Sequence, residues 1–173
     1  MTIDAVLPLL DAGALTGGVT LGVALGSPAL YERCRHERRF RFRPVTATHG
    51  LAALAGIGNF VSINSVLEVD LFGQAVADVL CGRQISGPGG RSILALPSVT
   101  ADGRISRIVA QFAAGTPATV ARAEAHIVVT EHGAAELRAR SLDGRAEALI
   151  AIAAPQHRAE LANTWDRMRR AMN

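Results

Sequence analysis

The chain has 173 residues, of which 49% are hydrophobic and only 4% aromatic, and its formal net charge is +3. This apolar content excludes a disordered chain, and the length suits a single domain over residues 1–173. Two cysteines far apart, Cys34 and Cys81, predict neither a disulfide framework nor a thiolate metal site. The start lacks a basic signal region and no apolar run reaches membrane-spanning length. We therefore expect a reduced, cytoplasmic protein with no metal site.

The first third of the chain predicts short helices that alternate with short strands. Asp4 can cap a first helix that Gly13 ends, although Pro8 lies in its interior. Ser27 and Pro28 form a typical helix start, a capping serine followed by proline at the first helical position. The predicted elements are a helix at 4–12, a buried strand at 19–25, a helix at 27–36, a strand at 40–45 and helical turns at 48–57.

A basic run lies within this region, between Arg33 and Arg43. Phe40 to Arg43 alternates apolar and charged residues with period two, as a half-buried strand does. An Arg-rich surface is the favoured interpretation, and we expect no nucleic-acid partner. An anion site for phosphate groups stays open on this pattern alone.

The rest of the chain predicts strands in the middle and helices at the end. Asn64-Ser65 separates two strands, and Gly73-Gln74 turns the chain back into a hairpin. The predicted strands span 60–63, 66–71, 75–80, 92–96, 104–111, 119–122 and 126–130; a short helix falls within 131–138, and helices at 143–154 and 156–172 are separated by Pro155. This order predicts an α/β fold with a mixed open β-sheet flanked by helices.

Residues 60–74 read Phe-Val-Ser-Ile-Asn-Ser-Val-Leu-Glu-Val-Asp-Leu-Phe-Gly-Gln, and this segment resembles the acetyl-CoA hydrolase/transferase family, of the 4-hydroxybutyrate CoA-transferase type. The resemblance implies a CoA-transferase (NagB/RpiA-like) fold, and it implies that the chain matches the C-terminal half of such an enzyme. Further segments match in the same order: 82–90, 91–98, 104–109, 128–133, 141–142 and 148–153.

The resemblance also implies a chemistry. Such enzymes act on acyl-CoA thioesters and small carboxylates through a glutamate nucleophile. Coenzyme A is then a substrate, and no cofactor is implied. An acid acceptor makes the enzyme a transferase, as in acetate metabolism, and water makes it a hydrolase.

Six residues are implied at the acyl-CoA site. Glycines bring the backbone close to a bound thioester and aim N–H groups at a developing oxyanion. The family's Gly-rich loop maps onto 82–90 and lies beside the segment around Ser65 in this expectation. The implied CoA- and acyl-binding residues are Ser65, Leu67, Glu68, Gly87, Gly89 and Gly90.

Two departures from the family bear on activity. Its nucleophilic glutamate falls just before Met1, so no catalytic residue is assigned within the chain. Glu68 is the substitute considered, and a hydrogen-bonded structural carboxylate is its favoured interpretation. The family's stretch after its Gly-Gly pair, including a wall of the acyl pocket, is missing after Gly90. The alternative function is therefore a catalytically silent remnant, or a subunit that binds CoA, an N-terminal-half chain or its own copy.

Glu131-His132 resembles an acid/base pair. Adjacent strand residues point to opposite faces, so we expect Glu131 to anchor a loop and His132 to face solvent.

Overall fold

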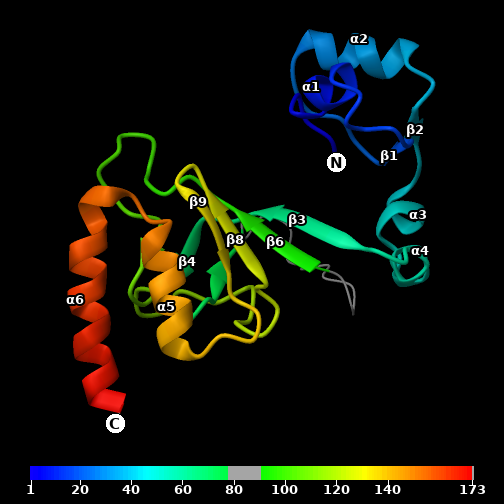
Figure 1. The fold of residues 1–173 in the computed structure, drawn as a ribbon. Helices are drawn as coiled ribbons and strands as arrows, with labels where there is room; N and C mark the ends of the chain where they lie inside the picture. The colour runs from blue at the N-terminus through cyan, green and yellow to red at the C-terminus, as the bar shows by residue number, and fades with distance from the viewer. Residues whose placement is uncertain (78–90, 173) are drawn as a thin grey trace. The chain divides into compact units, whose positions relative to one another are not determined.

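The computed structural model describes residues 1–77 and 91–172, which form two compact units, Met1–Gly58 and Asn59–Asn173. We call them unit 1 and unit 2 and describe each by itself (Figure 1). The single domain expected over 1–173 stays a prediction. Of the implied site, Gly87, Gly89 and Gly90 lie outside the described residues, as does Cys81.

Unit 1 is built on two short parallel strands joined by a crossover helix. Its small core gathers Leu10, Leu21 and Phe40. Both strands are shorter than the sequence predicts. The elements of unit 1 are α1 (Val6–Asp11), β1 (Val19–Leu21), α2 (Pro28–His36), β2 (Phe40–Phe42), α3 (Val45–His49) and α4 (Leu51–Ala55).

The start of α2 confirms the predicted Ser27-Pro28 boundary, since Ser27 is extended and Pro28 opens the helix. Asp4 was wrongly predicted to cap α1. The residue before α1 is Ala5, with no side-chain cap. Asp4 instead accepts hydrogen bonds from the Ser27 hydroxyl (2.6 Å) and from the Ser27 backbone N–H (3.0 Å). This carboxylate therefore links the start of α2 to the segment before α1.

Unit 2 contains a four-stranded sheet in the order β3-β6-β8-β9. Strands β3, β6 and β8 are parallel, and β9 returns antiparallel to β8. The prediction of a central strand near 92–96 is confirmed, because β6 lies between β3 and β8. The strands are β3 (Val61–Ser65), β6 (Arg91–Ala95), β8 (Ile127–Thr130) and β9 (Gly133–Glu136).

A second sheet of three strands has the order β5-β4-β7. The predicted hairpin is confirmed: β4 pairs antiparallel with β5, and Gly73 turns the chain with a φ of +84°. The buried Asp70 carboxylate fixes this turn by accepting the N–H of Phe72 (3.1 Å) and of Gln74 (2.8 Å). The strands are β4 (Glu68–Asp70), β5 (Ala75–Val76) and β7 (Ile108–Val109), the last parallel to β4.

Three sequence predictions in unit 2 are wrong. Residues 131–138 form a turn and β9 instead of a helix, because β9 pairs with β8. Asn64 and Ser65 belong to β3, where they pair with Leu94 and Ala95. The alternating stretches 104–111 and 119–122 contribute β7 and two isolated bridges, one at Ser106 and one at Val120.

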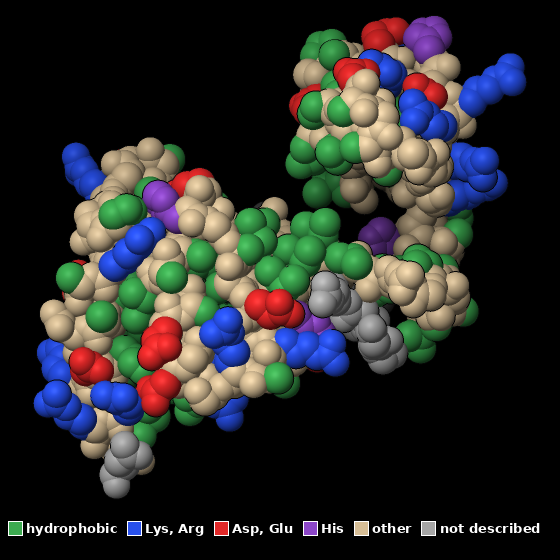
Figure 2. Space-filling model, in the orientation of Figure 1, with side chains coloured by type: hydrophobic (Ala, Val, Ile, Leu, Met, Phe, Trp, Pro, Cys, Tyr) green, Lys and Arg blue, Asp and Glu red, His purple; other side chains and the backbone are tan. Residues whose placement is uncertain are grey.

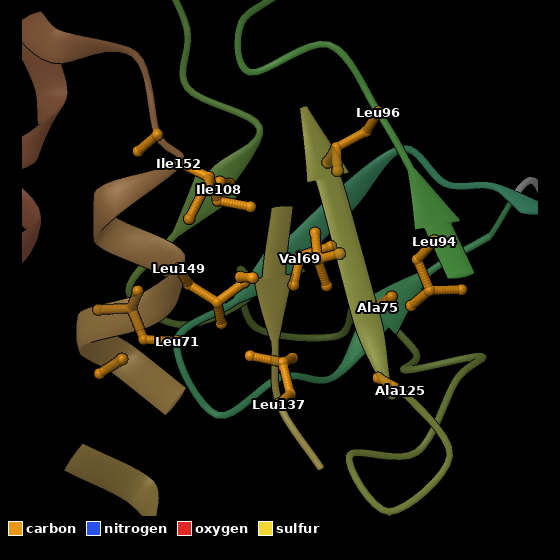
Figure 3. Packing of buried hydrophobic residues seen from close by; sticks show 14 of the residues in the cluster. Val69, Leu71, Ala75, Leu94, Leu96, Ile108, Ala125, Leu137, Leu149 and Ile152 are labelled. Carbon is orange, nitrogen blue, oxygen red and sulfur yellow. The ribbon is translucent and has the colours of Figure 1, made fainter. Parts of the chain in front are cut away.

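The main core joins both sheets to the last two helices. Val69, Leu94, Ile108 and Leu149 are buried together from separate elements (Figure 3). Helix α5 (Leu142–Ala151) packs against β9, and α6 (Pro155–Met172) packs against α5 (Figure 1). None of the described helices is both long and apolar enough to span a membrane.

Candidate functional site

The carboxyl ends of β3, β6 and β8 meet at one edge of the sheet because these strands are parallel. Ligands of open α/β sheets bind outside this edge, where the loops after the strands converge. The loops here begin after Ser65, Ala95 and Thr130. This edge, which we call the carboxyl edge, is therefore where the fold itself places a candidate site.

The structure places three of the implied residues at the carboxyl edge. Ser65 ends β3 and is exposed, Leu67 is 43% exposed, and Glu68 begins β4. The Leu67 N–H donates to the Val76 carbonyl at 2.7 Å, so β5 fixes the backbone of Leu67. The side chains of Ser65 and Leu67 are thus available to a ligand.

The implied glycines belong to a segment that the structure does not describe. Arg91, the next residue after Gly90, pairs with Val61 at the amino end of β3, whereas Ser65 pairs with Ala95 at the carboxyl end. A common site formed by the glycines and Ser65 stays a prediction.

Opposing influences act on the Glu68 carboxyl. Partial burial raises the pKa of Glu68, the nearby Arg107 guanidinium lowers it, and the charge of Asp70 raises it. Burial is the largest of these causes. Glu68 is thus a half-buried carboxyl group whose ionised form depends on the neighbouring Arg107.

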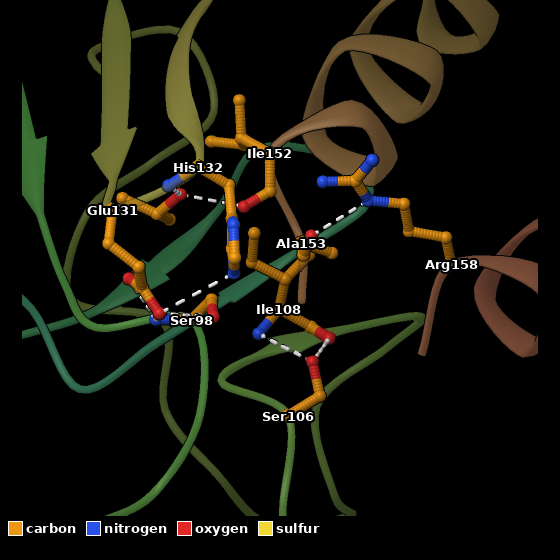
Figure 4. Close-up of polar contacts among 9 residues, drawn as sticks. Ser98, Ser106, Ile108, Glu131, His132, Ile152, Ala153 and Arg158 are labelled. Atoms are coloured by element: carbon orange, nitrogen blue, oxygen red, sulfur yellow. Dashed lines mark hydrogen bonds and ion pairs between the residues drawn. The ribbon is translucent and has the colours of Figure 1, made fainter. Parts of the chain in front are cut away.

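Ser98 and Glu131 are joined by several hydrogen bonds at the carboxyl edge (Figure 4). The Ser98 hydroxyl donates to Glu131 Oε1 at 2.6 Å, and the Ser98 N–H donates to Oε2 at 2.9 Å. These bonds lower the pKa of Glu131, the hydroxyl contributing most. The expectation that Glu131 anchors a loop is confirmed, since it fixes the loop after β6.

His132 lies on the same side as Glu131, contrary to the prediction from strand alternation. Both residues form the turn between β8 and β9, where alternation does not apply. His132 Nε2 lies 3.7 Å from Glu131 Oε1, and its side chain is 30% exposed. Ser98 is fully buried, and both its N–H and its hydroxyl donate to the Glu131 carboxylate. Ser98 is therefore an orienting residue for Glu131.

Sequence reasoning missed Ser98 and Arg107 as members of the site. Both lie in segments that carried the family resemblance, 91–98 and 104–109. Their place in these matching segments was the signal that could have identified them. No sequence pattern predicted the contact of Ser98 with Glu131 or that of Arg107 with Leu67.

Three of the six arginines in the basic run of unit 1 pair with acidic side chains, namely Arg33, Arg35 and Arg39. Arg33 contacts Asp11 at 2.6 Å, and Arg39 contacts Glu37 at 2.8 Å. Basic and acidic side chains are interspersed on the visible face of unit 1 (Figure 2). Of the two phenylalanines in the alternating segment, Phe40 is buried and Phe42 is 54% exposed. These contacts favour the interpretation as an Arg-rich surface.

Known proteins resemble almost the whole chain. A family described as the acetyl-CoA hydrolase/transferase C-terminal domain matches residues 26–165. The butyryl-CoA:acetate CoA-transferase of Anaerostipes caccae is 35% identical, over 96% of this chain and 44% of its own length. The 4-hydroxybutyrate coenzyme A transferase of Clostridium kluyveri is 32% identical, over 95% of this chain and 44% of its own length.

Solved structures agree. The 4-hydroxybutyrate CoA-transferase of Porphyromonas gingivalis has a TM-score of 0.75 at 36% identity, over 97% of this chain and 44% of its own. RipA from Yersinia pestis has a TM-score of 0.75 at 30% identity, over 96% of this chain and 41% of its own.

The chain thus spans less than half the length of these relatives. The two sequence alignments run over 198 and 187 positions, more than the 173 residues here, so each relative also carries internal residues without a counterpart. The matches confirm both the family resemblance and the α/β fold that it implied. The chain belongs to the acetyl-CoA hydrolase/transferase family and corresponds to its C-terminal domain.

Proposed function

We propose that this chain is the C-terminal part of an enzyme that transfers coenzyme A between acyl-CoA thioesters and small carboxylates, acetate among them, or hydrolyses the thioester. The similarity to named CoA-transferases over about 95% of the chain is the observation that carries this proposal. The carboxyl edge, with its exposed Ser65 and Leu67, supports it by offering a place for the substrate.

The proposed chemistry uses a glutamate carboxylate that enters from outside residues 1–173. The carboxylate attacks the thioester carbonyl and expels CoA thiolate, which leaves an acyl-glutamyl anhydride. The thiolate then attacks the glutamyl carbonyl, releases the acid and leaves a glutamyl-CoA thioester. An incoming carboxylate attacks the glutamyl-CoA thioester and runs these steps in reverse, which gives a new acyl-CoA. Water instead hydrolyses the thioester and releases coenzyme A. The route requires only the carboxylate and coenzyme A, so we propose no cofactor and no metal.

Within this chain, Ser65, Leu67 and Glu68 are proposed to contact the acyl-CoA, together with Gly87, Gly89 and Gly90. The backbone N–H groups of the glycines would stabilise the oxyanion formed at each attack. Glu131, held ionised by Ser98, is proposed to orient polar groups of the substrate rather than to attack it.

Reconstitution tests the proposal. The 173-residue chain is incubated with acetyl-CoA and succinate, alone and with the separately expressed N-terminal half of the Anaerostipes caccae relative. Thiol release reports hydrolysis, and formation of succinyl-CoA reports transfer. We expect no turnover from the chain alone and turnover from the mixture. Absence of turnover in the mixture, despite complex formation by gel filtration, would favour the silent subunit.

The second candidate is a silent remnant or a binding subunit in the cytoplasm, partnered by an N-terminal-half chain or by a second copy. It is kept because no residue within 1–173 is assigned as the nucleophile. Sequencing the DNA upstream of Met1 separates the candidates, because an in-frame extension with the glutamate supports the enzyme.

A further inference from the structure

The main chain of Arg107 joins two of the loops that leave the carboxyl edge. Its N–H donates to the Ser98 carbonyl at 2.9 Å, and its carbonyl accepts the Val69 N–H at 2.9 Å. Ser98 follows β6, and Val69 lies in the strand that follows the β3 exit. Through Ser98, this connection extends to Glu131 after β8.

The side chain of Arg107 makes the third connection. Its Nη1 donates to the Leu67 carbonyl at 3.0 Å. Its Nε is buried and has no hydrogen-bond partner among residues 1–77 and 91–172. The bond to Leu67 is thus the side-chain hydrogen bond that the described part of the chain offers to this guanidinium.

Glu68 lies beside this contact. Ile108, the residue after Arg107, pairs with Val69, the residue after Glu68, so Arg107 lies just before β7 at the level of Glu68, the first residue of β4. The guanidinium is close enough to favour the ionised carboxylate of Glu68. Loss of the Arg107 charge should therefore raise the pKa of Glu68.

We propose that Arg107 is the positioning residue of the carboxyl edge, because its guanidinium fixes the Leu67 carbonyl and thereby orients Ser65, Leu67 and Glu68. This role deepens the proposed function, since it rests on that segment contacting the acyl-CoA. The positioning itself is a property of the free chain and can be measured without substrate.

Hydrogen exchange of the free chain tests the hydrogen bond. In Arg107→Met the amides of Leu67 and Val69 should exchange about tenfold faster than in the wild type, the effect of losing a bond from a charged donor. The Val129 amide of β8 serves as the internal reference for global unfolding. Equal exchange in the variant and the wild type, after that correction, would overturn the proposal.

Titration of the Glu68 carboxyl by NMR tests the charge, with Glu68→Gln identifying the signal. The charged groups that act on Glu68 are Arg107 and Asp70. We expect the pKa of Glu68 to rise in Arg107→Met and to stay near the wild-type value in Arg107→Lys, which keeps the charge. An equal rise in both variants would show that side-chain packing alone matters, against the proposal.

Kinetics of the reconstituted enzyme test the role. A residue that positions a substrate-binding segment should raise KM for the acyl-CoA about tenfold in Arg107→Met, with kcat within about twofold. A loss confined to kcat would place Arg107 at the reacting atoms and overturn the assignment. If the wild-type mixture shows no turnover, the proposed function fails, while exchange and titration still decide whether Arg107 positions the segment.

Discussion

At the scale of single residues, the Ser98–Glu131 contact makes stability depend on pH. The hydroxyl of the fully buried Ser98 donates to a carboxylate that is about half exposed. Ser98→Ala should lower the free energy of unfolding by about 1 kcal/mol at pH 7, the typical value of one such hydrogen bond. Urea unfolding followed by circular dichroism measures the difference.

The sign of the pH dependence follows from the lowered pKa of Glu131. A carboxyl group with a lower pKa in the folded state adds stability above its unfolded pKa, near 4.5, and loses it as pH falls below. The effect of Ser98→Ala should therefore shrink between pH 5 and about pH 3. Glu131→Gln is the matched control, because it keeps an acceptor for Ser98 and removes the titration. An effect of Ser98→Ala that is equally large at both pH values would contradict this account.

At the scale of elements, sequence patterns predicted a helix or strand correctly where the residues that determine it are neighbours in the chain. Ser27 and Pro28 predict the start of α2 because both act on the adjacent backbone. The segment 131–138 was mispredicted as a short helix because the partner that makes it a strand is β8. Alternation in 104–111 predicted a strand longer than β7. Before β7, Ser106 pairs with Val99 as an isolated bridge, so the pairing does not extend β7 itself.

The candidate site likewise contains residues that a local sequence pattern predicted and residues that it did not. The sequence predicted Ser65, Leu67 and Glu68 because all three lie in one continuous segment that matches the family. The contact between Ser98 and Glu131 joins residues 33 positions apart, and that between Arg107 and Leu67 joins residues 40 apart. Such contacts depend on strand order and register, which no local pattern specifies.

Helix α6 depends on one aromatic anchor. Trp165, the single tryptophan, is 5% exposed and packs against Phe72 in a T-shaped arrangement with ring centroids 5.5 Å apart. Its Nε1–H donates to Asp143 of α5 at 2.9 Å. Trp165→Ala should cost about 3–5 kcal/mol of unfolding free energy, as expected for removing a buried Trp. Chemical denaturation followed by circular dichroism measures the cost.

Two variants test whether the anchor acts through packing. Trp165→Phe keeps a ring against Phe72 and loses the bond to Asp143, so it should cost clearly less than the alanine variant. Asn163→Ala changes an exposed position of the same helix and should stay within about 0.5 kcal/mol of the wild type. A small cost for Trp165→Ala would show that α6 contributes little to the fold.

At the scale of the whole molecule, the two units differ in how much apolar surface they bury. The core of unit 2 draws on both of its sheets and on α5 and α6, whereas the core cluster of unit 1 is Leu10, Leu21 and Phe40. Large hydrophobic side chains stay exposed in unit 1, among them Val45 at 65% and Leu51 at 69%. A unit of this size is marginal even with a complete core.

We therefore expect residues 59–173 to fold alone and residues 1–58 not to. The shorter piece cannot offset its conformational entropy with so little buried surface, so its amide spectrum should show the narrow dispersion of an unfolded chain. The longer piece should give a dispersed spectrum and a Tm within a few degrees of the full chain, because the carboxyl edge and its Arg107 contacts lie entirely within it. A dispersed spectrum for residues 1–58 would show that unit 1 is stabilised by more than its small core. An unfolded 59–173 piece would show that the carboxyl edge needs unit 1 to form.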